Sequence, residues 1–70
     1  MKITFTSHAQ YRLMERKISL ANVRDAVLNS NIFSAEGGLL RARKKFDGKI
    51  LEVVYKKSKS DIVVITAYYL

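Results

Sequence analysis

Residues 6–19, Thr-Ser-His-Ala-Gln-Tyr-Arg-Leu-Met-Glu-Arg-Lys-Ile-Ser, are the stretch around which the rest of the chain is organised. Ser7 is a favourable N-cap residue, and Gln10 follows it at the spacing of a capping box. Ser19 is a second cap signal, so the two residues before it are expected to form a turn. The stretch therefore predicts a short helix from Ser7 and a second helix after Ser19.

The first predicted helix carries the only histidine of the chain. His8, Arg12 and Arg16 are spaced four residues apart, so their side chains share one helix face. The positive end of the helix dipole disfavours an imidazolium in the first turn. His8 is therefore expected to be neutral near pH 7, which is the state that a general base requires. The alternatives are a histidine that ties the helix to the fold, and surface arginines paired with Glu15 or Asp25.

Length and composition predict one small domain, residues 1–70, of which 49% are apolar. A chain of this size buries about 60% of its unfolded surface. The absence of cysteine excludes disulfides and thiolate metal sites, and one histidine with scattered carboxylates argues against a bound metal or cofactor. Without a signal peptide or a long apolar run, we expect a cytoplasmic protein that does not cross a membrane.

The formal net charge of +7 is the strongest compositional signal. Dense positive charge attracts phosphates and speeds association with polyanions. Because the charges cluster on individual elements, nucleic acid is the expected partner. A lysine-rich surface that serves only solubility is the alternative.

The rest of the pattern predicts a helix and then a strand meander. The expected elements are a brief strand or extended arm at 2–5, a helix from about Leu20 to Asn29, a break at Asn29–Asn31, and strands at 32–36, 39–46, 49–57 and 61–70. Asp47-Gly48 lies between two strands and is the strongest short-range hairpin signal, which pairs Phe46 with Lys49. We therefore expect an α+β fold with two helices packed on one face of a three- or four-stranded antiparallel sheet.

Counting from this turn separates the two faces of the predicted sheet. The apolar face, which the helices should cover, holds Leu40, Ala42, Phe46, Leu51, Val53 and Tyr55, joined by Val63, Ile65, Ala67 and Tyr69 if the turn before Asp61 has three residues. The opposite face holds Arg41, Arg43 and Lys45 beside Glu52, Val54, Val64, Thr66 and Tyr68. Because a one-residue slip reverses the faces of a strand, an error in that turn would exchange Tyr68 for Tyr69.

The basic row of Arg41, Arg43 and Lys45, with Lys44 among them, suits a phosphate backbone. Arginine offers a planar fork that matches phosphate oxygens, and lysine adds a point charge. Tyr68 near this row could stack on a base or donate its hydroxyl. The alternatives are charges that only keep a sheet solvated and unaggregated, and a tyrosine that closes the core.

The motif Thr-x-His-Ala-x-x-Arg-x-x-x-Arg-x-Ile-Ser, from residue 6, resembles a family of small prokaryotic domains catalogued as a domain of unknown function. The similarity continues through a helix with Val23 and Val27 and a basic meander ending in Ile-Thr-Ala-Tyr at residues 65–68. That family is similar to BrnT-type toxins and, more remotely, to RelE-type toxins.

The resemblance implies a RelE-like α+β fold and metal-independent cleavage of messenger RNA, usually on the ribosome, by a toxin that an antitoxin silences. His8, Arg12 and Arg16 are the residues that match the motif itself. The chain is shorter than such toxins and lacks a helix after its last predicted strand.

Together, the residues and the resemblance predict a toxin-like, metal-independent ribonuclease without a cofactor, with RNA and an acidic antitoxin as partners. His8 is the expected base, with Arg12, Arg43 and Tyr68 as further catalytic residues, and Arg16, Arg41 and Lys45 as RNA-binding residues. If the helices cover the apolar face, His8 and Arg43 can share one site only near a sheet edge. The alternatives are a non-catalytic nucleic-acid-binding module and an interaction protein for an acidic partner or for a second copy in a homodimer.

Overall fold

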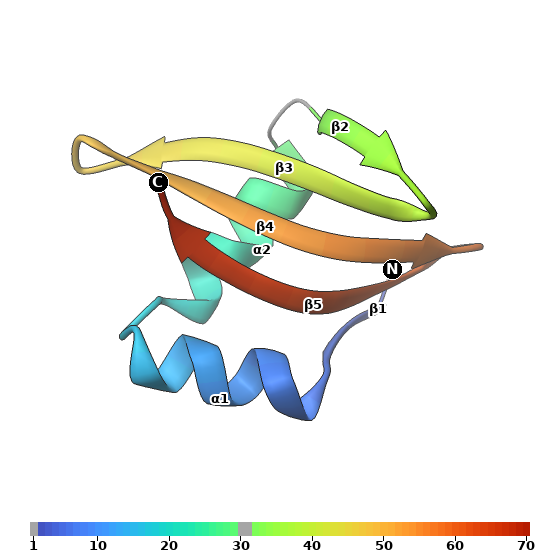
Figure 1. Cartoon of the computed structure of the whole chain (residues 1–70), viewed down its shortest axis with the longest axis horizontal. Helices are drawn as coiled ribbons and strands as arrows, with labels where there is room; N and C mark the ends of the chain where they lie inside the picture. The colour runs from blue at the N-terminus through green and yellow to red at the C-terminus, as the bar shows by residue number, and fades with distance from the viewer. Residues whose placement is uncertain (1, 30–31) are drawn as a thin grey trace.

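The computed structural model describes residues 2–29 and 32–70, and these form an α+β unit (Figure 1). The elements in chain order are β1 (Lys2–Phe5), α1 (Ser7–Glu15), α2 (Leu20–Asn29), β2 (Ile32–Glu36), β3 (Leu39–Phe46), β4 (Lys49–Ser58) and β5 (Asp61–Tyr69). The predicted class is confirmed, and the element bounds follow the sequence pattern closely. Of the predicted break after α2, residues 30 and 31 lie outside the described part of the chain.

The sheet has five strands in the order β1-β5-β4-β3-β2. Four of them form the predicted antiparallel meander, and β1 pairs with β5 in parallel. The expected three- or four-stranded antiparallel sheet is therefore wrong in strand number and in direction at one edge. The cause is that residues 2–5 join the sheet as a strand beside the last strand of the chain.

The turn at Asp47-Gly48 sets the register as predicted. Asp47 has φ +50° and Gly48 has φ +80°, which agrees with the two positive φ angles of a type I′ turn. Phe46 pairs with Lys49, and the core residue Ala42 consequently pairs with Val53.

The second turn is one residue shorter than expected, because Ser58 pairs directly with Asp61. This reverses the faces of the first half of β5, where Ile62 and Val64 are buried in place of the predicted Val63 and Ile65. A register shift beside Val54 and Tyr55 then restores the expected faces further along β5, so Ala67 is buried and Tyr68 points away from the core.

Thr6, not Ser7, is the N-cap of α1. Its side chain accepts a hydrogen bond from the backbone N–H of Ala9 at 3.0 Å, and Ser7 is the first helical residue. The predicted N-cap is therefore displaced by one residue, and the predicted capping box is wrong: Ala9 takes the third helical position, and the side-chain amide of Gln10 donates to the carbonyl of Phe5. The prediction for α2 is confirmed, since the hydroxyl of Ser19 accepts from the N–H of Asn22 at 3.3 Å.

The two helices take different positions against the sheet. α2 contacts β3 and β4, whereas α1 contacts β5 and β1 and follows the β5 side of the sheet in Figure 1. β1 pairs with β5 only as far as Val64. Beyond this point, the side chain of Thr6 donates to the carbonyl of Ile65, and Arg16 donates to that of Ala67. α1 therefore borders the part of the β5 edge that β1 leaves unpaired.

The core lies between the helices and one sheet face. Its buried residues are Ala9, Leu13, Ile18, Val23, Ala26, Val27, Ala42, Leu51, Val53, Tyr55, Ile62, Val64 and Ala67. Within residues 2–29 and 32–70, neither helix has the length and apolar character needed to cross a membrane.

Candidate nucleic-acid interface

Four side chains meet on the sheet face opposite α2, and we call them the Glu52 network (Arg41, Arg43, Glu52 and Tyr68). Glu52 is 2% exposed and is the only buried charged residue in the described part of the chain. Nη1 of Arg41 lies 3.0 Å from Oε2 of Glu52, and Nε of Arg43 lies 2.6 Å from Oε1. Tyr68 donates its phenolic hydrogen to Oε2, and its oxygen accepts from Nη1 of Arg41 at 3.0 Å.

Strand register explains why these residues meet. The β3–β4 hairpin sets Arg43 opposite Glu52, and the β4–β5 pairing sets Glu52 opposite Tyr68. Directly paired residues point to the same side of a sheet. Three adjacent strands therefore present Arg43, Glu52 and Tyr68 in one row, and Arg41 lies on the same face two residues before Arg43.

Hydrogen bonding keeps Glu52 ionised although it is buried. Burial alone would raise the pKa of Glu52, but hydrogen bonds from Tyr68, Arg43 and Arg41 outweigh it and hold the pKa below the ordinary value. The same bond to Glu52, followed by burial, raises the pKa of Tyr68. The pKa of Arg41 is raised first by its hydrogen bond to Glu52. At neutral pH the network therefore holds one carboxylate, two guanidiniums and a protonated phenol.

The two arginines remain accessible, whereas the carboxylate does not. The side chains of Arg41 and Arg43 are 41% and 35% exposed, and that of Glu52 is 3% exposed. A guanidinium has five N–H donors in a fixed plane, and Glu52 holds each plane in place through one nitrogen. The arrangement presents two oriented cations, with an excess of positive charge, on a sheet face that no helix covers.

The cations of β3 are divided between the two faces of the sheet. Lys45 is exposed on the face of the Glu52 network, as predicted. Lys44 points to the other face, where its Nζ lies 2.9 Å from Oδ2 of Asp25 on α2. Hydrogen bonds from Lys44 and then Asn29 lower the pKa of Asp25. Lys44 is thus not part of the predicted basic row, because consecutive strand residues alternate between faces.

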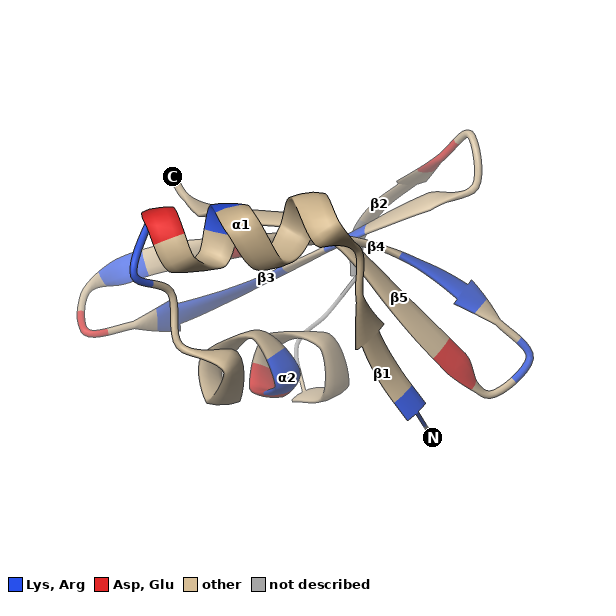
Figure 2. Ribbon diagram, turned by 90° about the horizontal axis from the view of Figure 1, so that it is seen from below, with Lys and Arg blue, Asp and Glu red and all other residues tan. Residues whose placement is uncertain are grey.

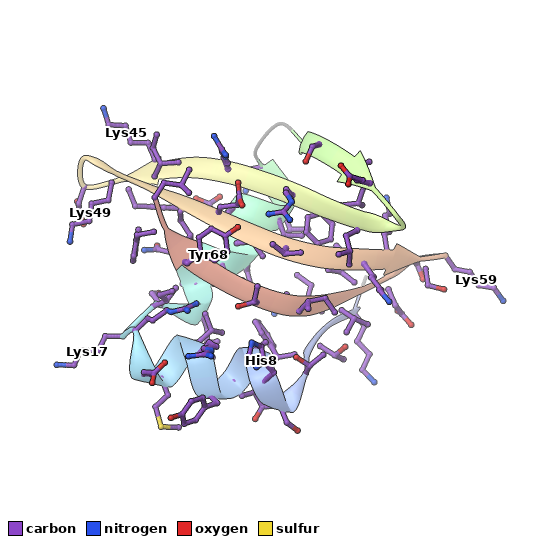
Figure 3. The ribbon with its side chains drawn as sticks, in the orientation of Figure 1. His8, Lys17, Lys45, Lys49, Lys59 and Tyr68 are labelled. Carbon is purple, nitrogen blue, oxygen red and sulfur yellow. The ribbon has the colours of Figure 1, made fainter. Side chains whose placement is uncertain are left out.

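The three motif residues, His8 and Arg12 of α1 and its C-cap Arg16, are outside the network. His8 is exposed, and Figure 3 shows it on the side of α1 that faces β5. Arg12 forms an ion pair with Glu15 at 2.9 Å, which is one of the pairings considered from the sequence. Nη1 of Arg16 donates to the carbonyl of Ala67 at 2.9 Å.

Arg16 fixes the position of this row beside β5. Ala67 immediately precedes Tyr68, so the α1 residues border the strand that carries the network tyrosine (Figure 3). The contact places Arg16 beside β5, whereas the prediction that His8 and Arg43 share a site near a sheet edge stays a prediction. Within residues 2–29 and 32–70, no hydrogen bond or ion pair joins His8 to the Glu52 network.

A comparison with protein-family models matches residues 5–69 to DUF4258, a domain of unknown function. The chain belongs to the DUF4258 family. The matched range includes α1 and the whole Glu52 network. No curated protein and no solved structure matches the chain.

Further lysines of this DUF4258 domain gather at the two ends of β4 (Figure 2). Lys45 and Lys49 flank the first hairpin turn, and Lys56, Lys57 and Lys59 lie at the turn to β5. Positive charge therefore extends from the network towards both ends of the sheet.

The described residues contain no group of three histidine, aspartate or glutamate side chains that could hold a metal ion.

Glu52 is the residue of the network that the sequence prediction placed on the correct face without giving it a role. The signal was present in the chain, because the Phe46–Lys49 register puts Glu52 directly opposite Arg43. A carboxylate on one strand is expected to form cross-strand pairs with two arginines on the neighbouring strand. What the alternation did not indicate is that Glu52 is buried on the face that the helices leave open.

Proposed function

We propose that this chain acts on RNA as a metal-independent endoribonuclease of the toxin-like kind, with the phosphate held on the Glu52 network. The observation that carries the proposal is a pair of accessible guanidiniums fixed by a buried, ionised carboxylate on an uncovered sheet face. Oriented arginines bind phosphate oxygens and stabilise the charge that develops on phosphorus during transfer. The net charge of +7 and the resemblance to BrnT-type and RelE-type toxins support the same proposal.

In the proposed reaction, the 2′-hydroxyl of RNA attacks the adjacent phosphorus and the bond to the 5′-oxygen breaks. The products are a 2′,3′-cyclic phosphate and a 5′-hydroxyl end. His8 takes the proton of the 2′-hydroxyl, because it is the exposed titratable base beside β5. Glu52 is too buried to reach a substrate hydroxyl and serves to position Arg41 and Arg43.

Tyr68 is assigned to substrate binding rather than to proton transfer. Its hydrogen is donated to Glu52, and its raised pKa makes it a weaker acid. Its ring is partly exposed and can stack on a base. The leaving 5′-oxygen therefore takes its proton from solvent. Arg12 and Arg16 extend the cationic surface along the β5 edge.

A non-catalytic RNA-binding module is the second candidate. It is favoured by the absence, in the described residues, of a hydrogen bond or ion pair that joins His8 to the Glu52 network. It predicts the same dependence of RNA affinity on Arg41 and Arg43, without cleavage of the RNA.

The test measures binding and cleavage of an end-labelled single-stranded RNA in buffer with EDTA. Neutralising one phosphate contact should lower the slope of log affinity against log salt by about 0.7. We expect this change for Arg41→Gln and Arg43→Gln. Lys44→Gln is the matched control, because it removes one positive charge from the same strand on the opposite face, and it should leave the slope almost unchanged.

Cleavage separates the two candidates. We expect His8→Ala to bind RNA normally and to lose about 10²- to 10⁴-fold of the cleavage rate, the range for general-base catalysis. Induced expression in a bacterium extends the test to ribosome-bound messenger. Growth arrest with messenger loss, relieved in His8→Ala and Arg43→Ala, supports the ribonuclease. RNA binding without cleavage, in the purified assay and in the bacterium, supports the binding module instead. A change of the salt slope in Lys44→Gln as large as in Arg41→Gln and Arg43→Gln refutes the assignment of the binding surface.

A further inference from the structure

An apolar groove lies on the helical side of the molecule. Its volume is about 460 Å³, and its lining residues are Phe5, Gln10, Leu13, Met14, Lys17, Ile18 and Leu20. They come from the end of β1, one side of α1, the turn between the helices and the start of α2. No residue of the Glu52 network lines the groove, so this surface is separate from the proposed RNA site.

Large apolar side chains at the groove are exposed to solvent. Met14 is 78% exposed and Leu20 is 56% exposed. A small domain buries a limited fraction of its surface, so it needs most of its large apolar side chains for its core. Contiguous exposed apolar residues beside a groove are typical of surfaces that bind another molecule.

The charge around the groove is positive and is not neutralised by the chain itself. Lys17 is the only charged lining residue, and no carboxylate lines the groove. Arg24 follows Leu20 by one turn of α2 and is exposed. Within residues 2–29 and 32–70, neither the Lys17 nor the Arg24 side chain has a hydrogen bond or ion pair.

We propose that this groove docks an amphipathic helix of an acidic partner protein. The apolar stripe of that helix enters between α1 and α2, and its carboxylates face Lys17 and Arg24. Helices commonly bind grooves through apolar side chains at positions i, i+3, i+4 and i+7. Two copies of this chain, each with a net charge of +7, would repel one another, which argues for an acidic partner over a second copy. The proposal does not depend on the ribonuclease assignment.

The test is a selection on the purified chain from a display library of helical peptides. Each peptide carries a leucine stripe at i, i+3, i+4 and i+7, and the flanking positions are randomised among glutamate, lysine, glutamine, alanine and serine. We expect the selected peptides to be enriched in glutamate beside the stripe. Selection of lysine-rich or uncharged flanks, or of no peptide at all, would overturn the proposal.

Matched substitutions then show where the selected peptide binds. Leu20→Gln should weaken binding by about tenfold or more, because a buried leucine contact is lost. Leu28→Gln is its control, since Leu28 is an exposed leucine of the same helix outside the groove. Lys17→Gln should weaken binding about two- to fivefold, as for an exposed ion pair. Lys59→Gln removes the same charge from another exposed turn residue with the same φ of 53° and should have no effect.

Two further measurements test whether a second copy of the chain occupies the groove and whether the groove is independent of the proposed RNA site. Peptide binding that is unchanged in Leu20→Gln refutes the groove as the docking site. Self-association of the wild-type chain in sedimentation experiments, lost in Leu20→Gln, would replace the acidic partner with a second copy. RNA binding should be unaffected by Leu20→Gln, so failure of this proposal and failure of the RNA proposal give different results.

Discussion

Tyr68 and Glu52 are direct cross-strand neighbours, and the phenol of Tyr68 donates its hydrogen to the buried carboxylate of Glu52. This bond gives Glu52 a neutral donor in addition to the guanidiniums of Arg41 and Arg43. It also fixes the tyrosine ring on the face that no helix covers. The stability of the network should therefore depend on both the phenolic hydroxyl and the ionisation of Glu52.

The first prediction concerns Tyr68→Phe, which removes that donor. We expect a loss of about 1.5–3 kcal/mol in the free energy of unfolding at pH 7, the range for a hydrogen bond to a charged group. Because the folded pKa of Glu52 lies below its ordinary value of 4.5, ionised Glu52 stabilises the fold fully above that value. This stabilisation is lost as the pH falls through the folded pKa. Urea denaturation at neutral and acidic pH should show the two proteins converging in acid.

Tyr69→Phe is the control for this substitution. Tyr69 packs against the core side of the sheet, and its hydroxyl has no hydrogen bond within the described residues. Tyr69→Phe should lower the free energy of unfolding only slightly, and by the same amount at neutral and acidic pH. A difference between Tyr68→Phe and wild type that stays constant from pH 7 to pH 3 would contradict the role given to Glu52.

The face of Tyr68 was predicted correctly because two local errors cancelled. The prediction assumed a three-residue turn before Asp61 and a regular β5. The real turn is one residue shorter, which reverses the faces, and the register shift next to Tyr55 reverses them again. The turn at Asp47-Gly48 could be predicted because its residues favour positive φ. Lys59 adopts a positive φ without any sequence signal.

Non-local pairing set the other limit on predicting the fold. Residues 2–5 are too short to indicate which strand they join, and their partner β5 begins almost 60 residues later. The position of α1 follows from that pairing, because α1 borders β5 where β1 ends. Alternation around the hairpin was sufficient to bring Arg41, Arg43 and Glu52 onto one face. It could not indicate that Arg16 would contact β5 directly.

The second prediction tests the N-cap of α1. Thr6→Ala should cost about 1 kcal/mol in the free energy of unfolding, because the N–H of Ala9 loses its side-chain acceptor. Ser7→Ala should have little effect, since Ser7 is inside the helix and alanine favours helical structure. Thermal or urea unfolding of both variants measures the difference. A larger cost for Ser7→Ala would restore the cap position inferred from the sequence.

The third prediction concerns the ion pair between Asp25 and Lys44 on the helical side of the sheet. NMR titration of the aspartate carboxyl groups should give Asp25 a pKa below the ordinary value of 3.8. In Lys44→Gln the pKa of Asp25 should rise, because the hydrogen bond from Lys44 is the largest cause of its lowering. Asp61, which has no ion pair within the described residues, serves as the internal reference. An Asp25 titration unchanged in Lys44→Gln would disprove the pairing.

The last prediction separates positioning from binding within the Glu52 network. Glu52→Gln keeps the shape of the side chain and removes the charge that holds two guanidiniums, so we expect a loss of about 1.5–3 kcal/mol in stability. RNA affinity should be retained or increased, because the carboxylate no longer competes with phosphate for Arg41 and Arg43. Any cleavage rate should fall at saturating RNA, since the arginines lose their orientation. Single-turnover kinetics and binding titrations on one RNA give both values. A loss of affinity as large as that of Arg43→Gln would mean that Glu52 is needed to form the binding surface itself.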